Sequence, residues 1–411
     1  MLRVSYKYHM SWTEKVYCRL YQKKQRIKLV RAPYRKPEIL RQWDDCVHLL
    51  SENNVKRVLL ITEQSVSVNT CAEVIKNAFD EIGLQYSLYI CANRNNRISD
   101  VENASTLYLQ DNCDGIMAVG GSMIMDCAKL SAAKIVRQDL TVRGLCGVMQ
   151  IQSQLPMLIA IPTVAGTGCE AATITGAVSD KLKLKWLAYD TSLIPDYVLM
   201  MPEWMTDLSS CMLAACGMST LAQAIEAYIG HDGTEQCKQY AKTSVSVLHK
   251  YLKYACRHPE NVEAREKMLL ASHYADLSHL QAFPGYVYAM ANAFSMQCDI
   301  SLEMAQAMVL PVILQHYGKS CYKELAQLAK DIGIVSEKIS AAKAAQEFID
   351  WIYDFNRDMG IPSKYLLSEV DIAYITMHTL HEANPLYPVP KLMGYDELEL
   401  ILRAISQDVV T

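Results

Sequence analysis

The hydrophobic pattern changes about halfway along the chain. In the first half, short apolar runs alternate with segments whose apolar residues recur every three or four positions. The short runs are typical of buried strands and the periodic segments of helices. The predicted strands cover residues 55–62, 84–90, 114–121 and 155–163. Strands that alternate with helices predict parallel βαβ units in a doubly wound sheet.

Helices are predicted between these strands and throughout the second half. The predicted helices cover 38–54, 67–83, 101–112, 123–136, 207–229, 233–256, 260–282, 285–297 and 303–317. The fold class expected is therefore an N-terminal α/β domain with a doubly wound, Rossmann-like parallel sheet, followed by an all-α helical domain.

The change of pattern also sets the expected domain boundaries. Residues 38–197 are predicted to form a dinucleotide-binding α/β domain, and 198–411 a helical domain. Residues 1–37 form a separate arm rich in lysine and arginine. Interleaved tyrosines favour an arm that packs on a neighbouring surface or a partner subunit, with a transit peptide as the alternative.

Composition narrows the class of protein. The chain has 411 residues, 51% of them apolar and 20% charged, and a net charge of −4. Such a balance is ordinary for a globular protein, and overall it predicts neither nucleic acid nor an anionic membrane as a partner. Apolar runs are broken by proline and glycine before the ~18–20 residues that a membrane helix needs. The 14 cysteines are scattered without paired spacing, so reduced thiols and a cytoplasmic location are expected.

Small and hydroxyl-bearing residues follow two of the predicted strands. In a doubly wound sheet, ligands bind where strands end and helices begin, and a helix N-terminus there favours an anion. An acid at a strand end accepts the hydroxyls of a ribose and repels a 2′-phosphate. Tight turns and a solvated loop acid are the alternative explanations. The residues concerned are Glu63, Gly120, Gly121, Thr163, Gly166, Thr167 and Gly168.

Five stretches in this order resemble the signature blocks of the iron-containing (group III) alcohol dehydrogenase family: AVGGSMIMDCAK, LPMLIAIPTVAGTGCE, KWLAYDTSLIPDYVLMMPEWMT, GMSTLAQAIEAY and GYVYAMANAF with AQAMVLP after it. The resemblance covers roughly residues 38–411. It implies a dinucleotide-binding domain, a helical domain, and a divalent metal that meets the nicotinamide in the cleft between them. It also implies reversible hydride transfer between a small alcohol and NAD(P).

The resemblance carries a set of nucleotide-binding positions onto this chain. Ser122 stands where the family's phosphate-binding block has its third glycine, and Met123 where it has serine. Val164 and Cys169 replace a threonine and a serine of the next block. Glu63 at the ribose position favours NAD(H) over NADP. The positions carried over as cofactor-binding are Glu63, Gly120, Gly121, Ser122, Asp126, Lys129, Thr163, Gly166, Thr167, Gly168 and Lys185.

The metal-binding positions depart from the family pattern. The family's four ligand positions correspond to Ser219, Gln223, Tyr288 and Leu302, and a neighbouring catalytic histidine corresponds to Asn292. Neutral oxygens bind Fe²⁺ or Zn²⁺ weakly, and leucine cannot bind at all. No iron or zinc is therefore expected at this site.

Without a metal, hydride transfer needs another group to stabilise the developing alkoxide. Tyr288, Asn292 and Lys185 are the candidate catalytic residues, although Tyr288 as a mere space-filling replacement is the favoured alternative. Histidines of two other helices are expected to be structural. These are His273 and His279, with Asp276 between them, and the pair His378 and His381.

Three functions remain open at this point. The first is an iron-type alcohol dehydrogenase-like, NAD-linked oxidoreductase of a small alcohol or aldehyde that works without the usual metal, expected as a homodimer. The second is a catalytically inactive pseudoenzyme on the same fold, a nucleotide sensor or scaffold. A metal-dependent sugar-phosphate cyclase ranks last, because its chemistry needs the missing ligands.

Overall fold

The computed structural model describes residues 9–64, 66–91, 96–164, 169–179, 184–205, 208–231 and 233–407, with the side chains of 66–70 and 72 left out. The chain divides into two compact units. The α/β unit contains residues 28–208 and 258–280, and the helical unit contains 1–27, 209–257 and 281–411. Each is described by itself below.

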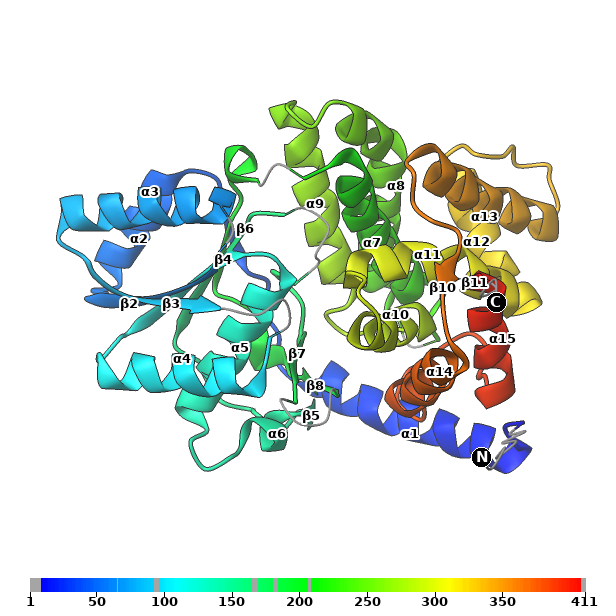
Figure 1. The fold of residues 1–411 in the computed structure, drawn as a ribbon, viewed down its shortest axis with the longest axis horizontal. Helices are drawn as coiled ribbons and strands as arrows, with labels where there is room; N and C mark the ends of the chain where they lie inside the picture. Colours follow the sequence, from blue (N-terminus) through cyan, green and yellow to red (C-terminus); the bar gives the residue numbers. More distant parts are fainter. Residues whose placement is uncertain are drawn as a thin grey trace. The chain divides into compact units, whose positions relative to one another are not determined.

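A six-stranded parallel sheet organises the α/β unit (Figure 1). Its strand order is β1-β9-β6-β4-β2-β3. The strands are β1 (Glu38–Leu40), β9 (Tyr197–Leu199), β6 (Met157–Pro162), β4 (Gly115–Gly120), β2 (Arg57–Glu63) and β3 (Gln85–Cys91). All five residues between the ends of β2 are buried, as are all residues of β4, because helices cover both faces of a parallel sheet.

Helices lie on both faces of this sheet. Figure 1 shows α2 (Trp43–Glu52) and α3 (Val66–Ile82) on one face, and α4 (Ile98–Gln110) and α5 (Ser122–Val136) on the other. Trp43, Phe79 and Trp204 join the core on the first face, where the rings of Trp43 and Phe79 lie 5.9 Å apart. The predicted doubly wound α/β fold is confirmed.

The strand order reverses between β2 and β4. From β2 the chain adds β3 on one side, and it then crosses to place β4 on the other. Loops that follow two strands on either side of such a reversal diverge and leave a crevice at the carboxyl edge of the sheet. The register sets Gly120 beside Pro162, so the segments after β2, β4 and β6 share this edge.

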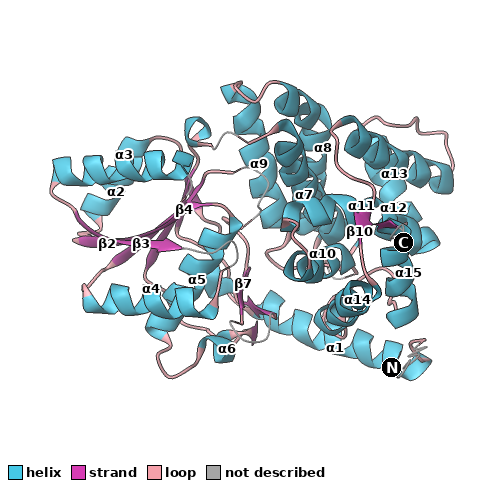
Figure 2. Ribbon diagram, in the orientation of Figure 1, coloured by secondary structure: helices cyan, strands magenta, loops and turns pink. Residues whose placement is uncertain are grey.

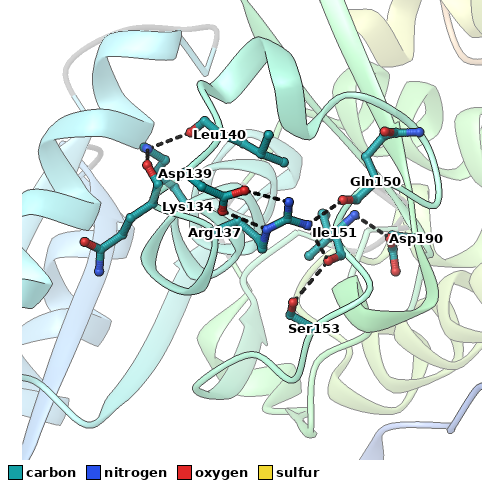
Figure 3. Close-up of polar contacts among 9 residues, drawn as sticks. Lys134, Arg137, Asp139, Leu140, Gln150, Ile151, Ser153 and Asp190 are labelled. Carbon is teal, nitrogen blue, oxygen red and sulfur yellow. Dashed lines mark hydrogen bonds and ion pairs between the residues drawn. The ribbon is translucent and has the colours of Figure 1, made fainter.

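A second sheet of three strands was not predicted from the sequence. It consists of β5 (Gly147–Val148), β8 (Lys185–Tyr189) and β7 (Ile174–Val178), with β7 and β8 antiparallel. Arg137 and Asp190 hold the segment next to it (Figure 3): the Arg137 guanidinium donates to the carbonyls of Gln150 and Ile151 at 2.9 and 3.0 Å. The Asp190 carboxylate accepts the Ile151 N–H at 2.9 Å.

The helical unit is built from long helices, with one pair of two-residue strands in the part described (Figure 2). Its helices are α7 (Ser210–Ile229), α8 (Glu235–Arg257), α10 (Tyr286–Gln297), α11 (Leu302–Tyr317), α12 (Tyr322–Asp331), α13 (Ala341–Asp358), α14 (Glu369–Ala383) and α15 (Tyr395–Ile405). The strands are β10 (Tyr365–Leu366) and β11 (Ser406–Gln407). The predicted helical second half is confirmed.

Helix α7 is the one described helix long and apolar enough to cross a membrane, and 89% of its apolar window is buried inside the protein. Such burial is typical of a core helix. Its neighbours in the unit are α8 and α11, so its apolar surface is covered by protein.

Three segments differ from the sequence interpretation. Residues 38–40 were expected to begin a helix but form β1, because they pair in register with 197–199 at the sheet edge. Helix α9 (Val262–Ser278) groups with the α/β unit, although it follows α8 in the chain. The N-terminal arm contains helix α1 (Trp12–Arg31), which begins in the helical unit and whose residues from Lys28 onward group with the α/β unit.

Candidate functional site

Glu63 and Gly121 meet at the point where the strand order reverses. Glu63 ends β2 and is half-buried, and its carboxylate accepts the backbone N–H of Gly121. Burial raises the pKa of Glu63, and this hydrogen bond opposes the rise. Thr62 reinforces the link from within the sheet, since its hydroxyl donates to the Val119 carbonyl at 2.9 Å. The two predicted ribose- and phosphate-side residues are therefore in direct contact.

Gly120 is required for this turn. Its φ is +157°, and a Cβ built on it would lie 2.6 Å from Cγ1 of Ile124. The chain can pass from β4 into α5 at this angle only where no side chain stands. Gly121 then serves as the N-cap of α5 and offers no side chain to the N–H groups of the first turn. Those N–H groups and the helix dipole favour an anion here.

The other predicted residues of this edge are only partly described. Ser122 begins α5 and is half-buried, and Thr163 is fully buried, with its N–H donating to the Gly120 carbonyl at 3.2 Å. Gly166, Thr167 and Gly168 lie outside the described residues.

Asp126 and Lys185 form a buried ion pair in the α/β unit. Nζ of Lys185 lies 3.2 Å from Oδ2 of Asp126, and these side chains are 16% and 8% exposed. The Thr175 hydroxyl donates to Oδ1 of the same carboxylate at 2.9 Å. The pair joins α5 to β8, so the structure brings together two residues that the sequence places 59 positions apart.

Lys129 is not available as a direct ligand in this conformation. It is 1% exposed, and its ammonium donates to the Ala172 carbonyl at 2.7 Å. Asp276 of α9 accepts the Ala171 N–H at 2.7 Å and acts electrostatically on Lys129. Burial lowers the pKa of Lys129, and Asp276 is among the acids that oppose this shift. Together Lys129 and Asp276 fasten the chain just after the predicted Gly-Thr-Gly loop.

The structure gives Asp276 a role that the sequence analysis did not predict. From the sequence it was named only as the residue between two histidines that were expected to be structural, because its partners are distant in the chain. The structure shows it fully buried. Its role in the structure is to hold the backbone of 171 and to face the buried lysine.

Glu170 adds a second buried acid to this region. Its Oε2 accepts the Cys169 N–H at 3.1 Å, and the Ser272 hydroxyl also donates to the carboxylate. Oε1 is buried and has no hydrogen-bond partner among the described residues. Burial raises the pKa of both Glu170 and Cys169, which favours the neutral thiol of Cys169 over the thiolate.

In the helical unit, the predicted metal-ligand positions lie on α7, α10 and the first residue of α11. Ser219 is 5% exposed, and its hydroxyl donates to Oε1 of Gln306 at 2.5 Å. Gln223 and Tyr288 are half-buried, as is Leu302, which follows the N-cap Ser301. α11 packs against both α7 and α10.

Asn292 takes part in a separate hydrogen-bond network. Its amide donates to both carboxylate oxygens of Glu382 at 3.2 and 3.3 Å, and the Tyr387 hydroxyl donates to Oε1 of Glu382 at 3.0 Å. Sequence reasoning missed Glu382 and Gln306, since each bonds its partner across a long stretch of chain, and it missed Tyr387, which bonds the nearby Glu382.

The residues at the family's four metal-ligand positions do not fit a divalent metal. A hydroxyl, an amide, a phenol and a leucine include no anionic or imidazole donor, and the Ser219 hydroxyl already bonds a neutral amide. Among the residues that the structure describes, no group of three or more His, Cys, Asp or Glu side chains is arranged to hold a metal ion.

Glu226 is a buried acid on the same helix as Ser219. Its carboxylate accepts the N–H groups of Gly285, Val287 and Tyr288 at 3.1, 2.7 and 3.3 Å. It thus caps α10, and a Cβ at Gly285 would lie 2.3 Å from Oε1 of Glu226. Burial raises the pKa of Glu226 to about 7, opposed by these backbone bonds.

The histidines considered from sequence are core or surface residues. His273 and His279 are 4% and 3% exposed, and burial lowers the pKa of each to about 4. The ring of His378 packs against Tyr374 in a tilted arrangement with ring centres 4.0 Å apart, and His381 is exposed. Both His378 and His381 lie on α14.

Two family models match almost the whole chain. The model described as "Iron-containing alcohol dehydrogenase" matches residues 40–202, and the one described as "Fe-containing alcohol dehydrogenase family, C-terminal" matches 213–405.

Individual relatives agree with these matches. The chain is 26% identical over 354 residues to 1,3-propanediol dehydrogenase of Klebsiella pneumoniae, covering 85% of this chain and 91% of that protein. A solved structure of 1,3-propanediol oxidoreductase superposes with a TM-score of 0.84 at 23% identity, over 90% of this chain and 98% of that one. The NAD⁺ complex of a sulfoacetaldehyde reductase from Bifidobacterium kashiwanohense gives 0.77 at 22% identity, over 91% and 98%.

Proposed function

The chain belongs to the iron-containing alcohol dehydrogenase family, and from this premise we propose that it is an NAD-linked oxidoreductase of a small alcohol or carbonyl compound that works without the family's metal. The observation that carries the proposal is a contrast between the residues at the strand ends and the residues at the metal-ligand positions. Glu63 and the Gly120–Gly121 turn suit a dinucleotide, whereas Ser219, Gln223 and Leu302 do not suit Fe²⁺ or Zn²⁺.

The residues at the strand ends fit NAD(H). The Glu63 carboxylate keeps one oxygen for the Gly121 N–H and has a second for a ribose hydroxyl. The same negative charge repels the 2′-phosphate of NADP(H). The backbone N–H groups of the first turn of α5 would hold the pyrophosphate, because Gly120 and Gly121 carry no side chain that keeps it from the backbone. When bound, the nicotinamide donates or accepts the hydride.

The chain's own side chains then handle the proton. In the reducing direction, a hydride adds to the carbonyl carbon and the oxygen takes one proton. The Tyr288 phenol donates that proton and regains one from solvent, and Asn292, held by Glu382, donates a hydrogen bond to the developing alkoxide. Lys185, paired with Asp126, orients the nicotinamide side of the α/β unit.

The relatives supply the substrate class. Their names describe dehydrogenases of propanediol and methanol and a reductase of sulfoacetaldehyde, all of them small alcohols or aldehydes. A homodimer located in the cytoplasm, with an N-terminal arm, a dinucleotide-binding domain and a helical domain, completes the proposal.

A nucleotide-binding protein without turnover is the second candidate. It is favoured by one observation: polar residues at the family's metal and catalytic positions already bond to other side chains of the helical unit, as in Ser219 with Gln306 and Asn292 with Glu382. Residues already satisfied in this way stabilise the helical unit whether or not any chemistry takes place.

The deciding experiment is a titration of chelator-treated protein with NADH and with NADPH, followed by calorimetry. Micromolar binding of NADH and much weaker binding of NADPH is expected. Turnover of a panel of short aldehydes by the same metal-free sample then supports the oxidoreductase, and binding without turnover supports the second candidate. Absence of binding by either nucleotide would refute both.

Metal analysis provides the complementary measurement. The purified protein is expected to contain far less than one iron or zinc per chain, because its donor set is neutral. One tightly held metal per chain, together with activity lost on chelation and restored by Fe²⁺ or Zn²⁺, would contradict the metal-free proposal.

A further inference from the structure

Helix α1 turns a strongly basic and apolar face to solvent. It carries seven lysine or arginine residues and a single acid, whereas the whole chain has a net charge of −4. The exposed large apolar side chains are Trp12 (76%), Leu20 (64%), Tyr17 (59%), Ile27 (42%), Val30 (38%) and Val16 (37%). Exposed apolar side chains interspersed with lysines on an outer helix face mark an interaction surface.

The opposite face of α1 is already packed on the protein. Cys18, Gln22, Gln25 and Leu29 are at most 6% exposed. The Gln22 amide donates to the Tyr387 carbonyl at 2.6 Å, and the Arg19 guanidinium donates to the Pro390 carbonyl at 3.4 Å. The buried face therefore attaches α1 to the protein. The exposed apolar residues lie on the opposite face of the helix.

The exposed residues form one continuous band. Trp12, Val16 and Leu20 are spaced by four, and Ile27 follows seven residues later, so at 100° per residue they fall within roughly 80° of each other. Tyr17 widens the apolar band to roughly 140°. The exposed lysines Lys23 and Lys24 lie within the same arc.

We propose that this face of α1 docks on an anionic lipid surface. Charge selects an acidic partner and argues against a second copy of α1, which would oppose like charges. The width of the band favours a flat surface over a single partner helix, whose seam is narrower. Trp12 and Tyr17 are residue types that settle at the headgroup level, and each lysine near an anionic leaflet strengthens binding.

The inference is independent of catalysis, since α1 contains no residue assigned to the nucleotide or metal positions. It also refines the sequence expectation of no membrane partner. That expectation rested on the charge of the whole chain, and the basic residues are concentrated on one helix. The remaining, acidic surface would be repelled by the same leaflet and would help to orient the protein on it.

The test is flotation of the full-length protein with vesicles of phosphatidylcholine, with and without one-third phosphatidylserine. The protein is expected to float with the anionic vesicles only, and to be released by 0.5 M salt. K23Q/K24Q should weaken the partition coefficient by about thirtyfold, and L20S/I27S by tenfold or more. These side chains are exposed, so both variants should remain folded.

A matched control removes two exposed leucines elsewhere. Leu366 and Leu400 are 59% and 58% exposed, and L366S/L400S should bind anionic vesicles like the native chain. Equal binding to neutral vesicles, or none to either kind, would overturn the proposal. So would a concentration-dependent oligomer that L20S/I27S dissociates without any vesicle binding, because the occupant would then be a second copy. Binding to polyglutamate but not to vesicles would assign the face to an acidic polypeptide instead.

Discussion

Polar residues at the carboxyl edge of the large sheet and polar residues inside the helical unit make different kinds of contact. At the edge, the Glu63 carboxylate accepts the Gly121 N–H, and Gly120 leaves the turn into α5 free of a side chain. In the helical unit, Ser219 bonds Gln306 and Asn292 bonds Glu382, so the polar groups are satisfied by the protein itself. The difference shows that the turn into α5 leaves backbone N–H groups without a side-chain cap, whereas polar side chains of the helical unit bond to other side chains.

The largest expected effect comes from the buried pair that supports the nucleotide edge. Lys129→Met removes the ammonium that faces Asp276 and leaves a fully buried carboxylate without it, which should lower the free energy of unfolding by about 3–5 kcal/mol. Asp276→Asn in the same chain should recover part of this loss. Urea unfolding of the two single variants and the double variant measures the coupling energy, and simple additivity would show that the two residues do not interact.

Gly120→Val tests the turn between β4 and α5 at the carboxyl edge of the sheet. Its side chain would overlap Ile124, so the turn must shift, and NADH binding should weaken by at least about a hundredfold. Gly144→Ala is the control, because a Cβ there meets nothing closer than 3.4 Å. Calorimetric titration of both variants compares them, and native affinity in Gly120→Val would place the nucleotide elsewhere.

The two units should also respond to pH with opposite sign. Glu226 has a folded pKa of about 7 against 4.5, so its ionisation destabilises the helical unit as pH rises from 4.5 to 7. His273 and His279 have folded pKa values of about 4 against 6.5, so their protonation destabilises the α/β unit as pH falls from 6.5 to 4. Each contribution amounts to about 3 kcal/mol.

Hydrogen exchange read separately in α10 and α9 measures these responses. After correction for the intrinsic exchange rate, which itself rises with pH, Glu226→Gln should flatten the loss of protection in α10 between pH 4.5 and 7 without changing the acid response of α9. Tyr317 also faces Glu226, and it stays neutral over this range because burial raises its pKa. An unchanged pH slope in Glu226→Gln would remove Glu226 as its source.

Glu63→Gln should give the smallest effect. Removing the charge while keeping the shape is expected to reduce the preference for NADH over NADPH by about tenfold, because the repulsion of a 2′-phosphate is lost. The ratio of the two dissociation constants is the readout, and an unchanged ratio would mean that Glu63 does not read the ribose.

Local sequence patterns predicted most strands of the parallel sheet, but they did not predict the edge strand β1 or the smaller second sheet. The alternation of apolar runs and helical segments identified β2, β3, β4 and β6, because each strand carries its own signal over five or more residues. β1 was read as the start of a helix, since three residues carry no period. β7 and β8 were missed although they are consecutive in the chain and pair with each other, because neither was recognised as a strand by its own apolar pattern.

The candidate site divides in the same way. Glu63 and the glycines stand beside predicted strand ends, so their neighbourhood follows from topology alone. The Asp276 carboxylate that acts on buried Lys129 comes from α9, which returns to the α/β unit only after α7 and α8 have been added to the other one. Lys129 and Asp276 lie far apart in the chain, so no local sequence pattern predicts their interaction.

The chain thus passes between its two units at residues 27/28, 208/209, 257/258 and 280/281. Neither unit is one continuous stretch of the gene, so no single truncation yields an intact half. A fragment ending at 208 keeps every strand of the large sheet but loses Asp276 and leaves Lys129 buried without it. Any attempt to graft this nucleotide-binding edge onto another protein must therefore carry α9 as a second segment, or replace the buried lysine with an apolar residue.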